Sequence, residues 1–248
     1  MPHPPLNIVE CRAVIRYKPC LIFNDNEVPY VIWFEDALLL YGVPTVLFDL
    51  YILVLDIDIA ADYLIKAGWT VDTQSPRRVG NAEVKTRQQR LMTPDSQTTT
   101  VLLLASDWKF PLTDDSTLER LFLEELPDQT LSFPSLSGFL DALIETWLDS
   151  DDDSVLLHLA VQINYLYGHA PALKERSFAN QMKYEHRQFH FDVLAGMSTT
   201  LPFRKHQRGI RDALLQGRYE LQECSAPRDN DDFFNPWKNV RLPPPPES

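Results

Sequence analysis

The sequence has few cysteines, and none of them forms a ligand pattern. Its three cysteines, Cys11, Cys20 and Cys224, lie far apart, without a CxxC pair and without a histidine at ligand spacing. Neither a zinc site nor a disulfide framework is indicated. We expect reduced thiols in a cytoplasmic protein.

An uninterrupted apolar segment is also lacking. The chain begins Met-Pro-His-Pro-Pro, which is not a basic stretch followed by an apolar one, so we expect no secretory signal. The apolar stretch 28–54 is interrupted by Glu35, Asp36, Gly42, Pro44 and Asp49. A stretch broken in this way is a poor membrane span, and we expect no membrane association.

Positive charge is scarce, with 23 Lys and Arg against 35 Asp and Glu and a formal net charge of −12. This balance disfavours broad nucleic-acid binding. No P-loop, Rossmann fingerprint, EF-hand loop or Gly-x-Ser-x-Gly elbow occurs either. What remains is a chain of 248 residues, 44% hydrophobic, which is typical of a globular protein with one or two domains.

The clearest pattern is a strand, a short helix and a second strand in direct succession. Residues 30–33 and 46–54 are rich in β-branched and aromatic side chains, which predicts two strands buried on both faces. Residues 36–41 between them are rich in Ala and Leu, which predicts a helix. Gly42 is placed to end that helix, because a residue without a Cβ readily adopts the left-handed conformation.

This order resembles the entry motif of the nucleotidyltransferase superfamily, in particular its minimal and abortive-infection-type branches. That motif runs through an apolar strand, a glycine pair, a helix with a small residue, a closing glycine, a Val-Pro-Arg-like turn and a strand with Asp-x-Asp. The positions that match without a gap are Ala37, Gly42, Val43, Pro44 and Asp49. The resemblance implies an α/β fold, with a nucleotidyltransferase-like mixed sheet and helices, over residues 1–115.

The resemblance also implies that the chemical positions of the motif are substituted. Phe34 and Glu35 replace the glycine pair, Thr45 replaces the arginine and Tyr51 replaces the second aspartate. Carboxylates two residues apart on a strand share a face and can hold two divalent cations, whereas Asp49 with Tyr51 offers one carboxylate. A glycine loop lets backbone amides approach a triphosphate, whereas Phe34 is bulky and Glu35 repels phosphate. These substitutions predict weak or absent nucleotide binding.

Other carboxylates could compensate for the missing one. Asp107 ends a predicted strand at 101–106 and could lie near Asp49, or it could be an ordinary loop residue. Asp58, which forms a second pair with Asp56, is interpreted as the cap of a helix over 59–67. Asp49 is costly to bury within an apolar strand unless it is paired or faces a cleft. It could therefore be a remaining cleft residue or a structural hydrogen-bonding residue.

The pattern becomes helical after about residue 115. Apolar residues recur at a spacing of three to four from Leu118 to Tyr167, which predicts a helical region over 116–228 packed on the α/β domain. The acidic run 149–153 is expected to be a solvated connection. Residues 229–248, with four consecutive prolines, predict an extended tail.

A locally basic segment lies within this helical region. Lys183, Arg187 and His190 are predicted to share one helical face, where they could bind phosphate or an acidic partner. Salt bridges within the protein explain the same residues. His186 and His190 have the spacing of a metal pair but lack the His-Glu-x-x-His pattern.

Three functions remain open on this basis. The first is a noncatalytic protein of nucleotidyltransferase fold that uses no cofactor and acts by binding a protein partner or small ligand, or by assembly. The second is a divergent Mg²⁺-dependent nucleotidyltransferase, in which Asp49 holds the metal and Glu35 or Asp107 replaces the lost ligand. The third is a module that binds a small ligand in the former active-site cleft.

Overall fold

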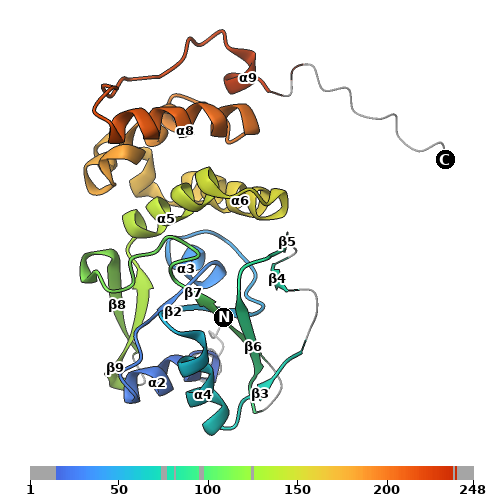
Figure 1. Ribbon diagram of the computed structural model, residues 1–248. Helices are drawn as coiled ribbons and strands as arrows, with labels where there is room; N and C mark the ends of the chain where they lie inside the picture. The colour runs from blue at the N-terminus through green and yellow to red at the C-terminus, as the bar shows by residue number, and fades with distance from the viewer. Residues whose placement is uncertain are drawn as a thin grey trace, which may run out of the picture. The chain divides into compact units, whose positions relative to one another are not determined.

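The computed structural model describes residues 15–73, 77–80, 82–94, 98–123, 126–236 and 238, without the side chains of residues 123 and 126–128. The chain forms two compact units (Figure 1). The first comprises Met1–Thr146 and Ser150–Ala170, and the second comprises Trp147–Asp149 and Pro171–Ser248. The sequence predicts a boundary near residue 115, whereas the first unit continues to Ala170 because two further helices belong to it.

A five-stranded mixed sheet forms the centre of the first unit. Its strands, in spatial order, are β1 (Tyr30–Ile32), β2 (Leu50–Val54), β7 (Thr99–Leu104), β6 (Gln88–Met92) and β3 (Thr70–Val71). β2 runs parallel to β7, and the other three pairs are antiparallel. The mixed α/β fold predicted from the sequence is confirmed.

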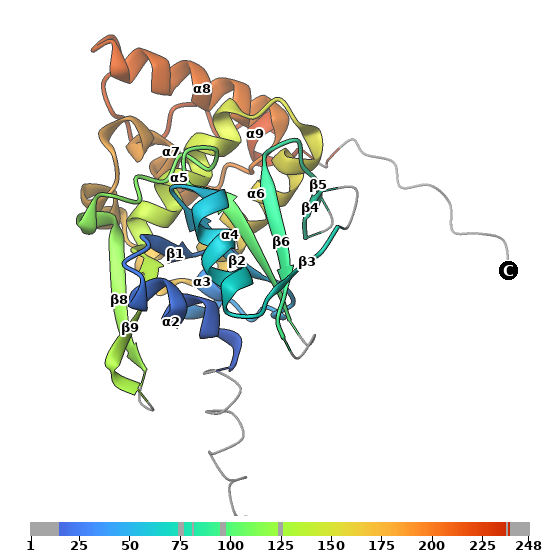
Figure 2. The ribbon, with the colours of Figure 1, turned by 60° about the horizontal axis from the view of Figure 1, so that its bottom comes forward.

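Helices and hairpins surround this sheet. They are α2 (Lys18–Asp25), α3 (Glu35–Leu40), α4 (Ile57–Lys66), β4 (Arg78–Val79), β5 (Ala82–Glu83), the 3₁₀ turn η1 (Asp115–Thr117), β8 (Leu118–Leu123), β9 (Leu126–Pro134), α5 (Leu136–Asp149) and α6 (Asp153–His169). Helix α4 packs on β6 and β7 and lies beside α2 (Figure 2). Helix α6 contacts α3 and the small β4–β5 hairpin.

The predicted strand–helix–strand order is present as β1, α3 and β2, with Ile32 opposite Ile52. Gly42 follows α3 with a φ of +85°, as expected for a glycine that ends a helix. The start of the second strand was predicted wrongly, because β2 begins at Leu50 and the preceding residues lie outside the sheet. Strand β1 has only three residues, which pair with Ile52, Leu53 and Val54 of β2. The residues before β2 therefore have no partner strand there. Val46 and Phe48, in the segment before β2, are 64% and 75% exposed.

Two further local predictions are corrected. Residues 118–123 form a β-strand in the β8–β9 hairpin rather than a helix, and Phe122 on that hairpin is 71% exposed. Helix α4 is capped by Asp56, whose side chain accepts from the amides of Asp58 and Ile59. Asp58 lies two residues further on, in the first turn of the helix, and forms an exposed ion pair with Arg87. The predicted extended tail over 229–248 is wrong at its start, because Asp231–Phe234 form a short helix in which Phe233 is buried, and residues 237 and 239–248 lie outside the described part of the chain.

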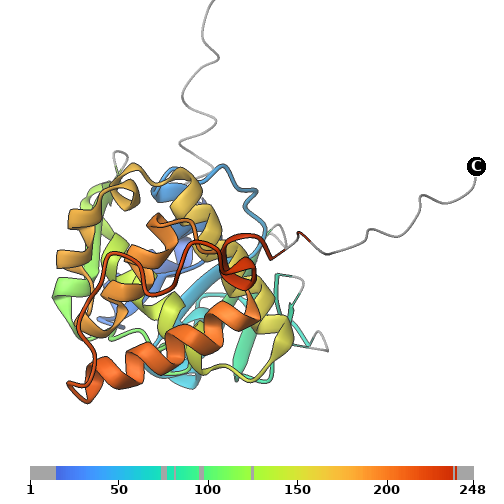
Figure 3. The same ribbon diagram turned by 90° about the horizontal axis from the view of Figure 1, so that it is seen from above.

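The second unit consists of short helices. They are the 3₁₀ helices η2 (Pro171–Lys174), η3 (Arg176–Gln181) and η4 (Tyr184–His186), and the α-helices α7 (Arg187–Leu194), α8 (Leu201–Leu215) and α9 (Asp231–Phe234). Its core includes the rings of Trp147, Phe189 and Phe203, which contact one another. After α8 the chain folds back along that helix to α9 (Figure 3). None of the helices in the described part of the chain is long and apolar enough to span a membrane.

A buried carboxylate holds the second unit together. The Asp192 side chain is fully buried and accepts hydrogen bonds from Gln188 Nε2 at 2.9 Å and from Gln207 Nε2 at 2.5 Å. It also accepts from the amide and the hydroxyl of Ser225, at 2.7 and 2.6 Å. Hydrogen bonds to a charged acceptor are the strong ones, so Asp192 ties the segment after α8 to both α7 and α8.

We expect Asp192→Ala to destabilise the protein by about 3 kcal/mol, because four donors, two of them on buried glutamine side chains, lose their acceptor. Urea unfolding followed by circular dichroism measures the effect. Asp229→Ala is the matched control, since Asp229 lies in the same unit with an exposed side chain, and it should change stability by less than about 0.5 kcal/mol. Equal losses in the two variants would show that Asp192 has no such role.

Candidate functional site

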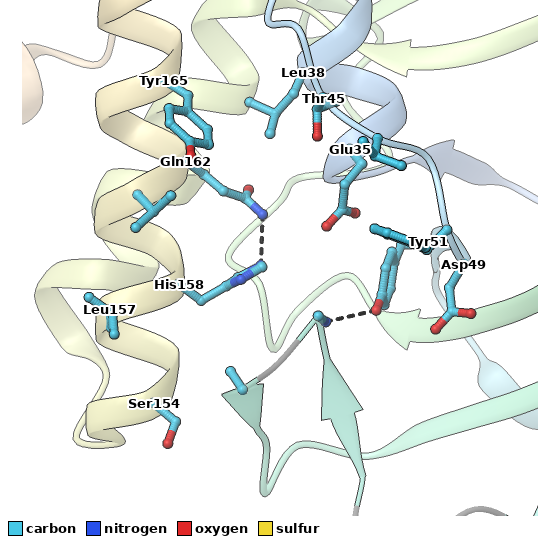
Figure 4. A pocket seen from close by; sticks show the side chains of 15 residues that line it. Glu35, Leu38, Thr45, Asp49, Tyr51, Ser154, Leu157, His158, Gln162 and Tyr165 are labelled. Carbon is cyan, nitrogen blue, oxygen red and sulfur yellow. Dashed lines mark hydrogen bonds between the residues drawn. The ribbon is translucent and has the colours of Figure 1, made fainter. Parts of the chain in front are cut away.

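A cleft of about 710 Å³ lies within the first unit. Its walls come from α3, the segment 45–51, the turn between β4 and β5, and one face of α6 (Figure 4). Four positions of the sequence motif line this cleft together, namely Glu35, Thr45, Asp49 and Tyr51. Positions that are distinct in the sequence motif are therefore neighbours in the structure.

Phe34 occupies the first glycine position of the motif. Its backbone has φ +51° and ψ −119°, a region that bulky residues rarely adopt and that costs about 1–3 kcal/mol. The side chain is completely buried. Its ring lies edge-on to the rings of Tyr51, Trp108 and His158, with centroid distances of 5.3, 4.9 and 5.1 Å. The backbone thus has a conformation suited to glycine, while the side chain is an anchor of the core.

Asp49 lies in a bend directly before β2, and its carboxylate is bound by an arginine. Arg90 Nη2 lies 2.9 Å from Asp49 Oδ2, and Arg90 Nε lies 3.5 Å from Asp72 Oδ2. The strand register explains this pair, because Arg90 and Tyr51 both lie opposite Val101 and so share one face of the sheet. Arg90 is not among the residues predicted from the sequence, where it stands only as a charged residue before the apolar pair Leu91 and Met92.

Tyr51, at the position of the second aspartate, has a structural contact of its own. Its hydroxyl accepts a hydrogen bond of 2.8 Å from the amide of Gly80, in the turn of the β4–β5 hairpin. Gly80 has φ +55°, and a Cβ there would lie 3.3 Å from the His158 ring. Tyr51 therefore holds this turn close to α6, where a side chain at position 80 would crowd the His158 ring.

Glu35 is the half-buried carboxylate of the cleft. Its Oε2 atom is buried and has no hydrogen-bond partner among the described residues. Burial raises the pKa of Glu35 to about 7, a hydrogen bond from its own backbone opposes the rise, and the charges of Asp36 and Asp49 add to it. The side chain therefore changes protonation near neutral pH.

His158 and Gln162 lie one turn apart on α6 and face the same space as Glu35 (Figure 4). Burial lowers the pKa of His158 to about 4, so the imidazole is neutral at pH 7. The His158 Nε2 and Gln162 Nε2 atoms are 2.7 Å apart, and the neutral ring accepts from the amide. Gln162 Oε1 is buried, and no described residue donates to it.

The structure does not bring Asp107 to this cleft. Strands β2 and β7 are parallel, with Leu50 opposite Thr100 and Val54 opposite Leu104. Asp49 precedes the first pair and Asp107 follows the last, so they lie at opposite ends of the sheet, more than about 15 Å apart along the strands. Asp107 lies in the turn after β7, where its amide donates to the Leu104 carbonyl.

Lys183, Arg187 and His190 lie in the second unit and do not share one open helical face. Lys183 precedes η4, whereas Arg187 begins α7 and donates to the carbonyls of Met182 and Asn180. His190 is completely buried, and its Nε2 lies 3.1 Å from the Glu175 carbonyl.

Other side chains of this basic segment also bind backbone carbonyls. Arg204 donates to Trp147 O and Leu148 O, and Arg208 donates to Leu148 O, which satisfies the last turn of α5. Within the described ranges, no group of three or more His, Cys, Asp or Glu side chains could hold a metal ion.

Comparison with known proteins gives distant likenesses only. No family model matches the chain, and no curated protein matches it. The fold is similar to the crystal structure of an antigenic nucleotidyltransferase-like protein from Paracoccidioides brasiliensis, with 14% identity and a TM-score of 0.40 over 66% of this chain and 80% of the other. It is also similar to JHP933 from Helicobacter pylori, with 12% identity and a TM-score of 0.38 over 84% and 90% of the two chains.

Glu35→Gln should stabilise the protein above pH 7 and have little effect near pH 4.5. The folded pKa, about 7, exceeds the ordinary value of 4.5, so the folded state holds the proton more tightly. Stability of the wild type therefore falls as pH rises from about 4.5 to about 7, and the glutamine variant lacks this fall. Melting temperatures of both proteins between pH 4.5 and 8 measure it. A difference that does not change with pH would contradict the assignment.

Tyr51→Phe should leave the fold intact and loosen the β4–β5 turn. The Gly80 amide loses its acceptor, at a cost of about 1 kcal/mol, while the ring contact with Phe34 remains. Hydrogen exchange should accelerate at residues 78–83. Tyr63→Phe, on α4 outside the cleft, is the control and should leave exchange at this hairpin unchanged. Unchanged exchange in Tyr51→Phe would mean that the hydroxyl does not hold the turn.

Proposed function

We propose that this chain is a noncatalytic protein of nucleotidyltransferase-like fold that acts by binding in the cleft around Asp49. The Arg90–Asp49 ion pair carries the proposal. In a phosphoryl-transferring site, a carboxylate at this position binds divalent cations. Here the Arg90 guanidinium, 2.9 Å from the carboxylate, supplies the positive charge in place of a metal ion.

The other substitutions support the same function. The Tyr51 hydroxyl is bonded to Gly80 and offers no second carboxylate. The Phe34 ring fills the core beneath the turn where a phosphate loop would lie. Among the described residues that line the cleft, none is a lysine or an arginine. A triphosphate would therefore meet Glu35 and Asp49 without a free cation to offset their charge.

One observation favours a divergent Mg²⁺-dependent nucleotidyltransferase as the second candidate. Glu35 and Asp49 line the same cleft, so two carboxylates are available in principle. The donor set fits a divalent ion poorly, because Asp49 is already paired with Arg90 and burial favours the neutral form of Glu35. We therefore assign no step through a metal ion.

According to this proposal, the protein acts by binding a small ligand or a protein partner. The formal net charge of −12 favours partners that carry positive charge over nucleic acid. The widely spaced cysteines fit a reducing, cytoplasmic location. Cys20 and Cys224 are both free thiols.

Calorimetry with ATP, GTP, CTP and UTP, each with Mg²⁺, should show no binding at micromolar concentration. Melting curves with and without Mg²⁺ should coincide, for the wild type and for Asp49→Asn alike. The reason is that Asp49 is already paired with Arg90 and does not bind a cation. A rise in melting temperature with Mg²⁺ that vanishes in Asp49→Asn would overturn the proposal. Micromolar binding of a nucleotide that depends on Asp49 would overturn it equally.

A further inference from the structure

We propose that the cleft binds a small organic cation, with a protonated amine or amidine at one end and an apolar body at the other. This inference rests on the proposed noncatalytic function of the same cleft. It adds the chemical class of the ligand, which follows from the polar atoms, the exposed apolar side chains and the charge of the walls.

The polar atoms of the cleft favour a ligand that donates hydrogen bonds. Glu35 Oε2 and Gln162 Oε1 are buried acceptors without a partner among the described residues. An unsatisfied buried acceptor is costly, and a carboxylate more so. Rotation of the carboxylate about its last bond exchanges its two oxygens, so a donor in the cleft can reach either one. The His158 ring beside them is neutral and already accepts from Gln162.

The apolar part of the ligand has two facing walls to contact. Leu157, Val161 and Tyr165 recur every four residues on one face of α6 and are 69%, 38% and 48% exposed. Val46 and Phe48, on the segment before β2, line the same cleft. Exposed apolar side chains on both walls of one cleft are typical of a ligand site.

Charge decides which apolar ligands can enter. An anion would approach Glu35 and Asp49, with no lysine or arginine on the described lining. A neutral hydrocarbon would leave the Glu35 carboxylate desolvated and unpaired. A cation satisfies Glu35, and the exposed Tyr165 ring offers it a π face. The volume of about 710 Å³ lies within the range of small-molecule sites.

Calorimetry at pH 8 with benzylamine, benzamidine and tryptamine tests the inference, since Glu35 is ionised and the amines are protonated at that pH. Benzyl alcohol and benzoate serve as neutral and anionic counterparts of the same size. We expect at least one cation to bind at least about tenfold more tightly than both counterparts, because it alone makes a charge-assisted hydrogen bond.

Two variants locate the binding. Glu35→Gln keeps the shape of the side chain and should weaken the cation at least about tenfold. Asp107→Asn makes the same chemical change at the other end of the sheet and should leave affinity unchanged. Leu157→Ser alters an exposed side chain on the cleft wall and should weaken binding about fivefold without loss of stability.

The inference is wrong if none of the three cations binds, or if Glu35→Gln binds them as well as the wild type does. Either result leaves the proposed noncatalytic function standing, because that function depends on the absence of Mg²⁺ and nucleotide binding at Asp49. Conversely, Asp49-dependent nucleotide binding overturns the proposed function, whatever the amines do.

Discussion

Burial of the Phe34 ring is the constraint on which the cleft depends. The ring contacts β2 through Tyr51, the loop after β7 through Trp108, and α6 through His158. A positive φ costs about 1–3 kcal/mol, whereas emptying the site of a buried phenylalanine costs about 3–5 kcal/mol. Packing therefore outweighs the backbone strain, and the turn keeps its conformation without a glycine. The same ring fixes the spacing between the sheet and α6, which form opposite sides of the cleft.

The positions of the arginine side chains determine which carboxylate near the cleft is left without an ion pair. Asp36 is bound by Arg16 at 2.7 Å and by the Tyr17 hydroxyl at 2.9 Å, and Asp49 is bound by Arg90. Glu35, directly before Asp36, has no ion pair with any residue that the structure describes. Its two neighbouring carboxylates are paired with arginines, whereas burial raises the pKa of Glu35 to about 7, so Glu35 is the group of the three that changes protonation near neutral pH.

The parts of this fold that were predictable are those that local sequence determines. The β1–α3–β2 order could be read from apolar runs, helix formers and a glycine stop, because each signal acts within a few residues. The start of β2 could not, since an apolar residue such as Phe48 does not reveal whether it faces the core or a cleft. The hairpin at 118–134 was missed because its apolar spacing also fits a helix.

Contacts that depend on the register between strands could not be predicted from the sequence. Arg90 reaches Asp49 only because β6, β7 and β2 lie side by side with Val101 between Arg90 and Tyr51. Asp107 is separated from Asp49 because β2 and β7 are parallel. Both facts depend on the pairing of β2 with β7, whose partner residues are 50 apart in sequence, as in Leu50 with Thr100, so neither segment alone encodes them.

The substituted motif positions depend on one another through a closed ring of contacts. Phe34 packs on Tyr51, Tyr51 is bonded to Gly80, Gly80 lies against His158, and His158 packs on Phe34. An aspartate in place of Tyr51 would be too short to reach Gly80 and would leave the edge of Phe34 uncovered. A glycine in place of Phe34 would leave a cavity beside Trp108 and His158. Residues coupled in this way do not change independently, so restoring one position of the motif removes two contacts and rebuilds no metal site while Arg90 holds Asp49.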